Sequence, residues 1–217
     1  PYKRTVIPLL DVISESAQAM GAVNTICIEE NGRLFGDNTD ASGFIADILG
    51  HGIEAGMMRA LVLGAGGAAR AIVYGLAQAG SPRIDILNRR PARAQALARD
   101  MQETFPQCVF RGHSLRALEE ASVEADLIVN CTPVGMVPLA ENSPWDPAIP
   151  FRRGQVVMDL VYNPAKTALM QQAEGQNCRV LGGMGMLVQQ AARSFSLWTG
   201  QEAPVEEMMR AAAEMHE

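Results

Sequence analysis

A glycine-rich turn at residues 64–70, with the sequence "GAGGAAR", carries the most specific chemistry in the chain. It follows the apolar run "ALVL" and opens a helical pattern, so that Gly64, Gly66 and Ala69 match the dinucleotide-binding spacing G-x-G-x-x-A. The first glycine permits a tight turn, the second lets the backbone approach a pyrophosphate, and the small third residue lets helix and strand pack. The anion would lie at the helix N-terminus. A glycine-rich turn without a ligand is the alternative. The residues expected to contact the dinucleotide are Gly64, Ala65, Gly66, Gly67 and Ala68.

The next apolar strand, "RIDILN" at 83–88, ends in a basic turn. In NAD sites an acid about twenty residues beyond the first glycine binds the ribose hydroxyls, and that count reaches Asp85. More strand follows Asp85, so we expect its carboxylate to lie away from the ligand. Guanidinium groups suit a 2′-phosphate instead, through charge-assisted bidentate bonds. This turn therefore favours NADP over NAD; the alternative is that the arginines are merely solvated. The residues expected to surround the 2′-phosphate are Asn88, Arg89, Arg90 and Arg93.

A third stretch, "GAVNTICIEENGRLFGDNTD" at 21–40, holds two Asn-Thr pairs and ends on a carboxylate. Two short strands joined by a turn at Asn31-Gly32 predict a hairpin. A helix should begin near Thr39 or Asp40. On local grounds Asp40 is a fair N-cap for that helix, and this interpretation is favoured as long as the residue is considered alone.

From residue 59 onward, short apolar strands alternate with helical stretches. That alternation predicts a parallel sheet covered by helices on both faces, in an α/β, Rossmann-type doubly wound fold. The expected strands are 60–64, 83–88, 109–112, 125–132, 155–161 and 179–183, and the expected helices are 68–79, 92–104, 115–121 and 165–174.

The two ends of the chain have a different texture. Apolar residues at helical spacing predict a helix over 5–19 that ends at Gly21. Two further helices are expected over 186–200 and after Pro204. Both ends should pack together outside the parallel sheet as part of an α/β substrate-binding domain. We thus expect three segments: 1–40 in the substrate-binding domain, 41–182 as the NADP-binding domain, and 183–217 returning to the first.

Composition limits the classes of partner. The 217 residues carry a net charge of −6, which argues against nucleic acid or an anionic membrane as the main partner. No apolar run approaches the roughly 18 residues of a membrane span, and a cytoplasmic location is expected. The four cysteines are scattered and lack a nearby histidine cluster, so we expect free thiols and no metal site.

Taken together and in order, several segments resemble the shikimate dehydrogenase family, including its quinate/shikimate paralogues. The matching segments are "PYK" at 1–3, "GAVNT" at 21–25, "GDNTD" at 36–40, "GAGGAAR" at 64–70, "NRRPAR" at 88–93, "NCTPVGM" at 130–136 and "GMGMLVQQA" at 183–191. The resemblance implies NADPH-dependent reduction of 3-dehydroshikimate to shikimate, in the biosynthesis of chorismate and aromatic amino acids.

The resemblance also implies roles for individual residues. Lys3 and Asp40 match the catalytic pair, in which a lysine ammonium donates a proton to the developing alkoxide and the carboxylate orients it. Substrate-binding residues would be Asn24, Asp40, Tyr162 and Gln190. Further cofactor-binding residues would be Thr132, Leu160 and Gly183. The implied partner is a small-molecule substrate, and we expect a monomer or a homodimer.

The chain departs from the family at its beginning, where the family's Ser-rich motif and substrate-binding Thr are missing. We therefore expect these 217 residues alone to bind NADPH far better than they turn over shikimate. Two alternatives stay open. One is a quinate/shikimate dehydrogenase with relaxed use of NAD and NADP, and the other is a truncated, non-catalytic NADP-binding fragment.

Overall fold

The computed structural model describes residues 2–214, in which the larger sheet has six parallel strands in the order β6-β5-β4-β7-β8-β9. Pro1, the first residue of the "PYK" segment, lies outside the described residues. Counted from the first strand of this sheet, the order is 3-2-1-4-5-6, which is the Rossmann order. The expected doubly wound parallel sheet is confirmed. The strands are β4 (Ala60–Leu63), β5 (Arg83–Asn88), β6 (Val109–Ser114), β7 (Leu127–Asn130), β8 (Val156–Asp159) and β9 (Arg179–Gly182).

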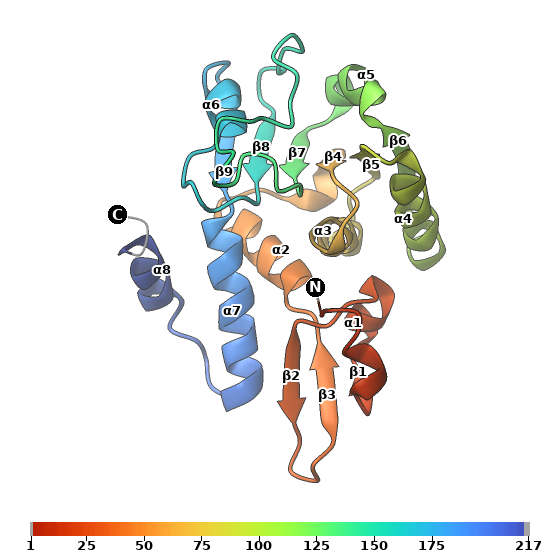
Figure 1. The fold of residues 1–217 in the computed structure, drawn as a ribbon, viewed down its shortest axis with the longest axis vertical. Coiled ribbons are helices and arrows are strands. Elements are labelled where there is room, and N and C mark those ends of the chain that lie inside the picture. Colours follow the sequence, from red (N-terminus) through yellow and green to blue (C-terminus); the bar gives the residue numbers. More distant parts are fainter. Residues whose placement is uncertain (1, 215–217) are drawn as a thin grey trace.

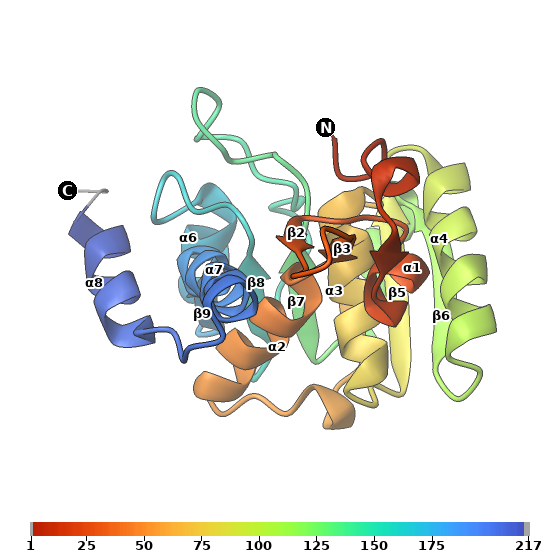
Figure 2. The ribbon, with the colours of Figure 1, turned by 90° about the horizontal axis from the view of Figure 1, so that it is seen from below.

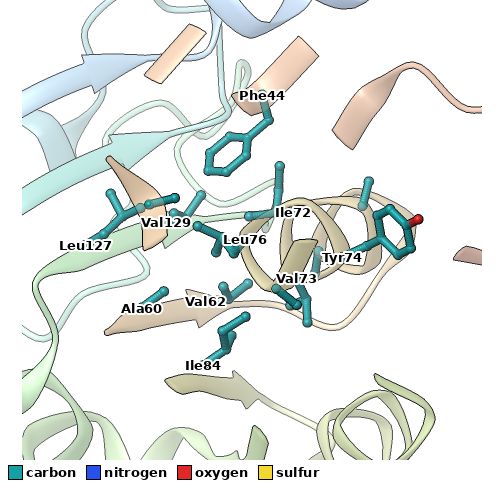
Figure 3. Close-up of a cluster of buried hydrophobic side chains, with 14 of the residues drawn as sticks. Phe44, Ala60, Val62, Ile72, Val73, Tyr74, Leu76, Ile84, Leu127 and Val129 are labelled. Carbon is teal, nitrogen blue, oxygen red and sulfur yellow. The ribbon is translucent and has the colours of Figure 1, made fainter. Parts of the chain in front are cut away.

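Helices cover both faces of this sheet because successive strand residues point to opposite sides. Val62 of β4 belongs to an apolar cluster under α2 (Asp40–Gly50), α3 (Gly67–Gln78) and α4 (Pro91–Thr104). Leu61, its neighbour, belongs to the cluster under α5 (Leu118–Glu124) and α6 (Ala168–Glu174). Figure 3 shows Phe44 of α2 and Ile72 of α3 over the first of these faces. Short 3₁₀ turns, η2 (Ala55–Met57) and η3 (Leu115–Ala117), lead into β4 and α5.

A second, three-stranded sheet has the order β1-β3-β2. Its hairpin is formed by β2 (Thr25–Ile28) and β3 (Leu34–Asp37), which pair antiparallel as predicted. Gly32 lies in the turn with φ of +83°, a conformation that favours glycine. The short strand β1 (Val12–Ile13) runs parallel to β3 on the other side.

The carboxy-terminal segment returns to this smaller sheet through α7. The long helix α7 (Met184–Thr199) lies along α2 and reaches β2, and α8 (Val205–Glu214) packs against α7 (Figure 1). Figure 2, seen from below, shows the same neighbourhood of α2, α7 and β2. The expectation that both ends pack together is therefore confirmed, whereas the three segment boundaries stay a prediction. No helix within residues 2–214 is long and apolar enough to cross a bilayer.

The predicted helix over 5–19 is wrong. A 3₁₀ turn, η1 (Ile7–Leu9), gives way to β1, and only α1 (Glu15–Met20) is helical. The backbone of Asp11 bonds to Leu34 O, and its carboxylate accepts from Leu34 N, so pairing with β3 overrides the helical pattern. Ser14 then starts α1 as its N-cap, with Oγ 3.1 Å from Ala17 N. The predicted end of the helix is correct, because Gly21 closes α1 in the left-handed conformation.

Glycines let α2 and α7 approach each other closely. A Cβ atom at Gly43 of α2 would lie 2.6 Å from the backbone N of Gln190 on α7. At Gly185 of α7, a Cβ atom would overlap the carboxylate of Asp47 on α2. Because neither glycine has a side chain, Gln190 is held against the first turn of α2.

Candidate active site

Three side chains from separate segments meet at the start of α2. Lys3 Nζ lies 2.6 Å from Asp40 Oδ2, and Asn24 Nδ2 lies 2.8 Å from Asp40 Oδ1. The backbone N–H of Val23 donates to Lys3 O at 2.8 Å, which ties the lysine segment to the chain just before β2. Both carboxylate oxygens of Asp40 are thus engaged by side chains that are distant in sequence.

The capping interpretation of Asp40 is wrong. Thr39 occupies the N-cap position and Asp40 is the first helical residue. A carboxylate in the first turn is favoured there by the helix dipole. Asp40 is buried, while the Lys3 side chain is 46% exposed. The ammonium group of Lys3 is therefore held by the Asp40 carboxylate and is still accessible from the solvent. This arrangement suits a proton donor that must reach a ligand.

Gln190 joins the same region from α7. Its Oε1 lies 3.5 Å from Thr39 Oγ1, and its Nε2 donates to Leu187 O at 2.9 Å. Asn24 Nδ2 also contacts Thr39 Oγ1, at 3.1 Å. The two candidate substrate-binding amides therefore lie on either side of Thr39, next to Asp40.

The glycine-rich turn has the geometry that dinucleotide binding requires. Gly64 has a φ of +114°, and its N–H donates to Leu87 O at 2.7 Å. A Cβ atom there would lie 3.3 Å from Thr132 Cγ2, so the loop after β7 lies directly beside the turn. At Gly66 and Gly67, by contrast, a Cβ atom would meet open space. The backbone that begins α3 is thus free to be approached by an anion.

A cleft of about 610 Å³ runs from the candidate lysine to this turn, between α1 on one side and α3 and α4 on the other. It brings Lys3 together with Ala65, Gly66, Gly67 and Arg93 in one hollow. The amides Asn24 and Gln190 lie outside its lining. The cleft also receives Arg70, Asp100 and Glu103, of which Arg70 and Asp100 form an ion pair at 2.5 Å.

The basic turn after β5 is exposed and well placed for an anion. Asn88 Nδ2 donates to Arg90 O at 3.0 Å, which shapes the turn before α4. Among residues 2–214, no ion pair involves Arg89, Arg90 or Arg93. Arg93 is the member of the group that lines the cleft. These guanidinium groups are therefore available to a phosphate.

Asp85 lies where the sequence predicted, away from the cleft. It is buried within β5, and its Oδ2 accepts from Arg83 Nε at 2.8 Å. Its carboxylate is thus already paired with a neighbouring residue. Asp85 is therefore not placed to bind the ribose hydroxyls of NAD.

Leu160 and Gly183 are brought together beyond β8 and β9. Leu160 N donates to Asn130 O at 3.0 Å, and a Cβ atom at Gly183 would overlap Leu160 O. This close approach is possible only because Gly183 has no side chain, and it fixes the position where α7 begins. Tyr162 lies two residues after Leu160 and is 43% exposed. It does not line the cleft described above.

A buried polar network at the carboxyl edge of the sheet was missed from the sequence. Asp159 accepts from Asn130 Nδ2 at 2.8 Å and from Thr167 Oγ1 at 2.7 Å, and burial raises the pKa of its carboxyl group. Asn130 Oδ1 in turn accepts from the N–H and Oγ1 of Thr132. The network fixes the loop that carries Thr132. The available signal was a polar residue at the end of each apolar strand, in "LIVN" and "VVMD".

The glycine-rich turn and the cleft beside it have the shape and charge that a dinucleotide phosphate requires. Gly64 makes the positive-φ turn, Gly66 and Gly67 leave open space at a helix N-terminus, and Arg93 adds a cation. Strands β4 and β7 lie side by side at the point where the strand order reverses, which is where ligands bind in open α/β sheets.

Comparison with known proteins agrees with this geometry. Residues 49–161 match the family model described as "Shikimate / quinate 5-dehydrogenase", and residues 183–213 match "Shikimate 5'-dehydrogenase C-terminal domain". The chain is 42% identical to the shikimate dehydrogenase (NADP(+)) of Moorella thermoacetica, over 99% of this chain and 72% of that protein. It is 39% identical to the quinate/shikimate dehydrogenase (NAD(+)) of Corynebacterium efficiens, over 96% of this chain and 72% of that protein.

A solved structure extends the comparison to three dimensions. The crystal structure of shikimate 5-dehydrogenase from Thermus thermophilus, in complex with NADP(H) and shikimate, superposes with a TM-score of 0.86. Identity to that protein is 38%, and the match covers 99% of this chain and 76% of that one.

Proposed function

The chain belongs to the shikimate dehydrogenase family, and we propose that it catalyses the reversible NADPH-dependent reduction of 3-dehydroshikimate to shikimate. This is a step toward chorismate and the aromatic amino acids. The observation that carries the proposal is the 2.6 Å contact between Lys3 Nζ and Asp40 Oδ2, because Lys3 also lines the cleft that holds the glycine-rich turn. A proton donor and a dinucleotide site therefore share one hollow.

Lys3 performs the proton transfer. Reduction of a ketone needs a hydride at carbon and a proton at the developing alkoxide oxygen. NADPH, when bound, supplies the hydride. The ammonium group of Lys3 stabilises the negative oxygen and donates the proton from Nζ, and in the reverse direction Lys3 accepts that proton from the hydroxyl. Asp40 holds the ammonium group in place through its Oδ2 atom.

The substrate ring is held by polar side chains from both chain ends. Asn24 and Gln190 lie on two sides of Thr39, beside the catalytic pair, and each offers an amide to a ring hydroxyl. Tyr162, from the segment after β8, adds a third polar contact in this proposal. Amides that bind substrate hydroxyl groups give selectivity, because an analogue without the hydroxyl leaves the amides unpaired.

NADP is the proposed cofactor. Gly64, Gly66 and Gly67 cradle its pyrophosphate, and the basic turn with Arg89, Arg90 and Arg93 binds its 2′-phosphate. Asn88 shapes that turn. Ala65, Ala68, Thr132, Leu160 and Gly183 border the rest of the cofactor in this assignment.

A second candidate is a quinate/shikimate dehydrogenase that uses NAD. It is favoured by the Corynebacterium efficiens relative, whose 39% identity is close to the 42% of the NADP-dependent relative from Moorella thermoacetica. The basic turn after β5 argues for NADP, because guanidinium groups there pair with a phosphate that NAD lacks.

Steady-state oxidation rates separate these candidates. We expect kcat/KM for shikimate with NADP⁺ to exceed the value with NAD⁺ by about tenfold or more, since one lost phosphate contact weakens binding by about that factor. We also expect shikimate to be preferred over quinate. A higher value with quinate and NAD⁺ would support the second candidate. Affinity for NADP⁺ without any turnover of either acid would indicate a non-catalytic NADP-binding protein. The oligomeric state, a monomer or a homodimer, stays a prediction for sedimentation analysis.

A further inference from the structure

Three buried hydroxyl groups lie next to one another beside the side chain of Asn24. They belong to Thr25 of β2, Thr39 at the start of α2, and Ser194 of α7. Thr25 and Thr39 are each 1% exposed and Ser194 is 6% exposed, so water does not reach them. Their hydrogen bonds must therefore be made with one another and with nearby protein groups.

The distances join the four side chains into a closed ring. Asn24 Nδ2 lies 3.1 Å from Thr39 Oγ1, which lies 3.2 Å from Ser194 Oγ. Ser194 Oγ lies 2.7 Å from Thr25 Oγ1, which lies 3.0 Å from Asn24 Oδ1. The ring begins at the amide nitrogen of Asn24 and returns to the amide oxygen of the same residue.

Two of the hydroxyls have a second acceptor within reach, since Ser194 Oγ lies 3.1 Å from Gln190 O and Thr39 Oγ1 lies 3.3 Å from Asn24 Oδ1. One direction around the ring makes all four of its contacts hydrogen bonds. An amide oxygen only accepts, so the hydroxyl of Thr25 must donate its single proton to Asn24 Oδ1. The bond between Thr25 and Ser194 then needs the proton of Ser194, and the bond between Ser194 and Thr39 needs the proton of Thr39. Asn24 Nδ2 donates to Thr39 and closes the ring. Each hydroxyl donates once and accepts once, and bonds aligned in this way polarise one another.

We propose that this ring positions the catalytic pair by fixing the orientation of the Asn24 amide, an inference that rests on the proposed function of Lys3 and Asp40. With one N–H in the ring, the other N–H of Asn24 donates to Asp40 Oδ1 at 2.8 Å. The backbone N–H of Thr39 donates to Asn24 Oδ1 at 2.9 Å and supports the same orientation. A flipped amide would turn its oxygen toward the carboxylate and repel it.

The ring therefore decides which oxygen of Asp40 is free for the lysine. Because Asn24 occupies Oδ1, Lys3 pairs with Oδ2. Ser194 comes from α7, so the ring is complete only while α7 packs against β2 and the start of α2. Thr25, Thr39 and Ser194 are positioning residues, since they act on the reaction through Asn24 and Asp40.

Shape-conserving variants test the ring. Thr25→Val and Ser194→Ala each remove one hydroxyl, whereas Thr25→Ser keeps it. Ser196→Ala is the matched control, because Ser196 lies two residues farther along α7 and outside the ring. The measurements are hydrogen exchange of the Asn24 side-chain amide by NMR, kcat and KM for shikimate, and the dissociation constant of NADP⁺.

We expect amide exchange in Thr25→Val and Ser194→Ala to be faster by about tenfold, which corresponds to losing one hydrogen bond. We expect kcat to fall by about tenfold to a hundredfold, since a misplaced reacting group is that costly. The affinity for NADP⁺ should change by less than about twofold, because the glycine-rich turn does not contact the ring. Thr25→Ser and Ser196→Ala should resemble the parent protein in every measurement.

Unchanged amide exchange and unchanged kcat in Thr25→Val would overturn the proposal. So would an equal loss in Ser196→Ala or a failure of Thr25→Ser to restore kcat, because both would indicate general loosening of α7 or β2. A parent protein that does not oxidise shikimate would contradict the proposed function instead. Amide exchange would then still report separately on whether the ring orients Asn24.

Discussion

At the scale of single residues, the role of a side chain here depends on partners that are far away in sequence. Asp40 considered alone is a reasonable helix cap, and Lys3 alone is an exposed residue near one end of the chain. At 2.6 Å from each other they become an ion pair whose ammonium group lines a cleft. The arginines of the basic turn are a different case. Within residues 2–214 no carboxylate pairs with Arg89, Arg90 or Arg93, and this leaves their charges available to a ligand.

The basic turn gives a prediction about cofactor choice. The double variant Arg89→Ala/Arg93→Ala should weaken NADPH binding by about a hundredfold or more, since charge-assisted hydrogen bonds contribute about 1.5–3 kcal/mol each. NADH binding should change by less than about threefold, because NADH has no 2′-phosphate. Fluorescence titration with each nucleotide measures both constants. Arg99→Ala, an exposed arginine on α4 outside the cleft, is the control. Equal losses for the two nucleotides would show that the turn does not recognise the phosphate.

At the scale of elements, the contact between α2 and α7 holds the site together. Gln190, Ser194 and the start of α2 are positioned by this contact, and it is close because Gly43 and Gly185 lack side chains. A buried carboxylate also lies in it. Asp47 of α2 has an Oδ2 atom without a hydrogen-bond partner among the described residues, and the backbone N–H of Met186 on α7 partly offsets the rise that burial causes in the pKa of Asp47.

Adding a methyl group to this contact should separate the two helices. Gly43→Ala places Cβ 2.6 Å from Gln190 N, so we expect unfolding free energy to fall by about 1–3 kcal/mol and kcat to fall as Gln190 moves. Gly50→Ala, on the same helix, meets open space. Gly50→Ala should leave kcat unchanged and raise the unfolding free energy by up to about 1 kcal/mol, since alanine has a higher helix propensity than glycine. Chemical denaturation measures both variants. A destabilisation of equal size in the two would contradict close packing at Gly43.

The buried Asp47 predicts a dependence of stability on pH. Burial raises the pKa of Asp47 in the folded protein, and His51, whose Nδ1 lies 3.5 Å away, only partly offsets it. The folded state thus holds this proton more tightly than the unfolded state. The stability that Asp47 contributes is present below its unfolded pKa of about 3.9, and it is lost as pH rises through the higher folded pKa.

Asp47→Asn removes this titration. From about pH 4 to pH 8, the unfolding free energy of the parent should decline relative to that of the variant, as measured by denaturant titration at each pH. The test compares how the unfolding free energy of each protein changes with pH, so a constant difference in stability between parent and variant does not affect it. A difference that stays constant, or grows in favour of the parent, would show that Asp47 is not penalised by its burial.

At the scale of the whole molecule, local patterns predicted the parallel sheet and the cofactor turn well. "RIDILN" is the strand Arg83–Asn88, and the glycine-rich turn opens α3 as expected, because periodicity and glycine spacing are local signals. The helix over 5–19 failed because pairing of Asp11 with Leu34 of β3 is not local. The contacts of Asp40 with Lys3, and of Thr25 with Ser194, join residues 37 and 169 positions apart. Only the resemblance to a known family pointed to the first, and nothing in the sequence pointed to the second.

The most direct test of the account is shikimate oxidation with NADP⁺ by the parent, Lys3→Gln and Asp40→Asn, with NADP⁺ affinity measured on the same preparations. Lys166→Gln is the control, since Lys166 forms an ion pair with Glu174 away from the cleft. We predict that kcat falls by about a hundredfold or more in the first two variants, as expected for loss of a general acid, while the dissociation constant of NADP⁺ changes by less than about threefold. Turnover by Lys3→Gln within about tenfold of the parent, below the range expected for such a loss, would contradict the assignment of proton transfer to this pair.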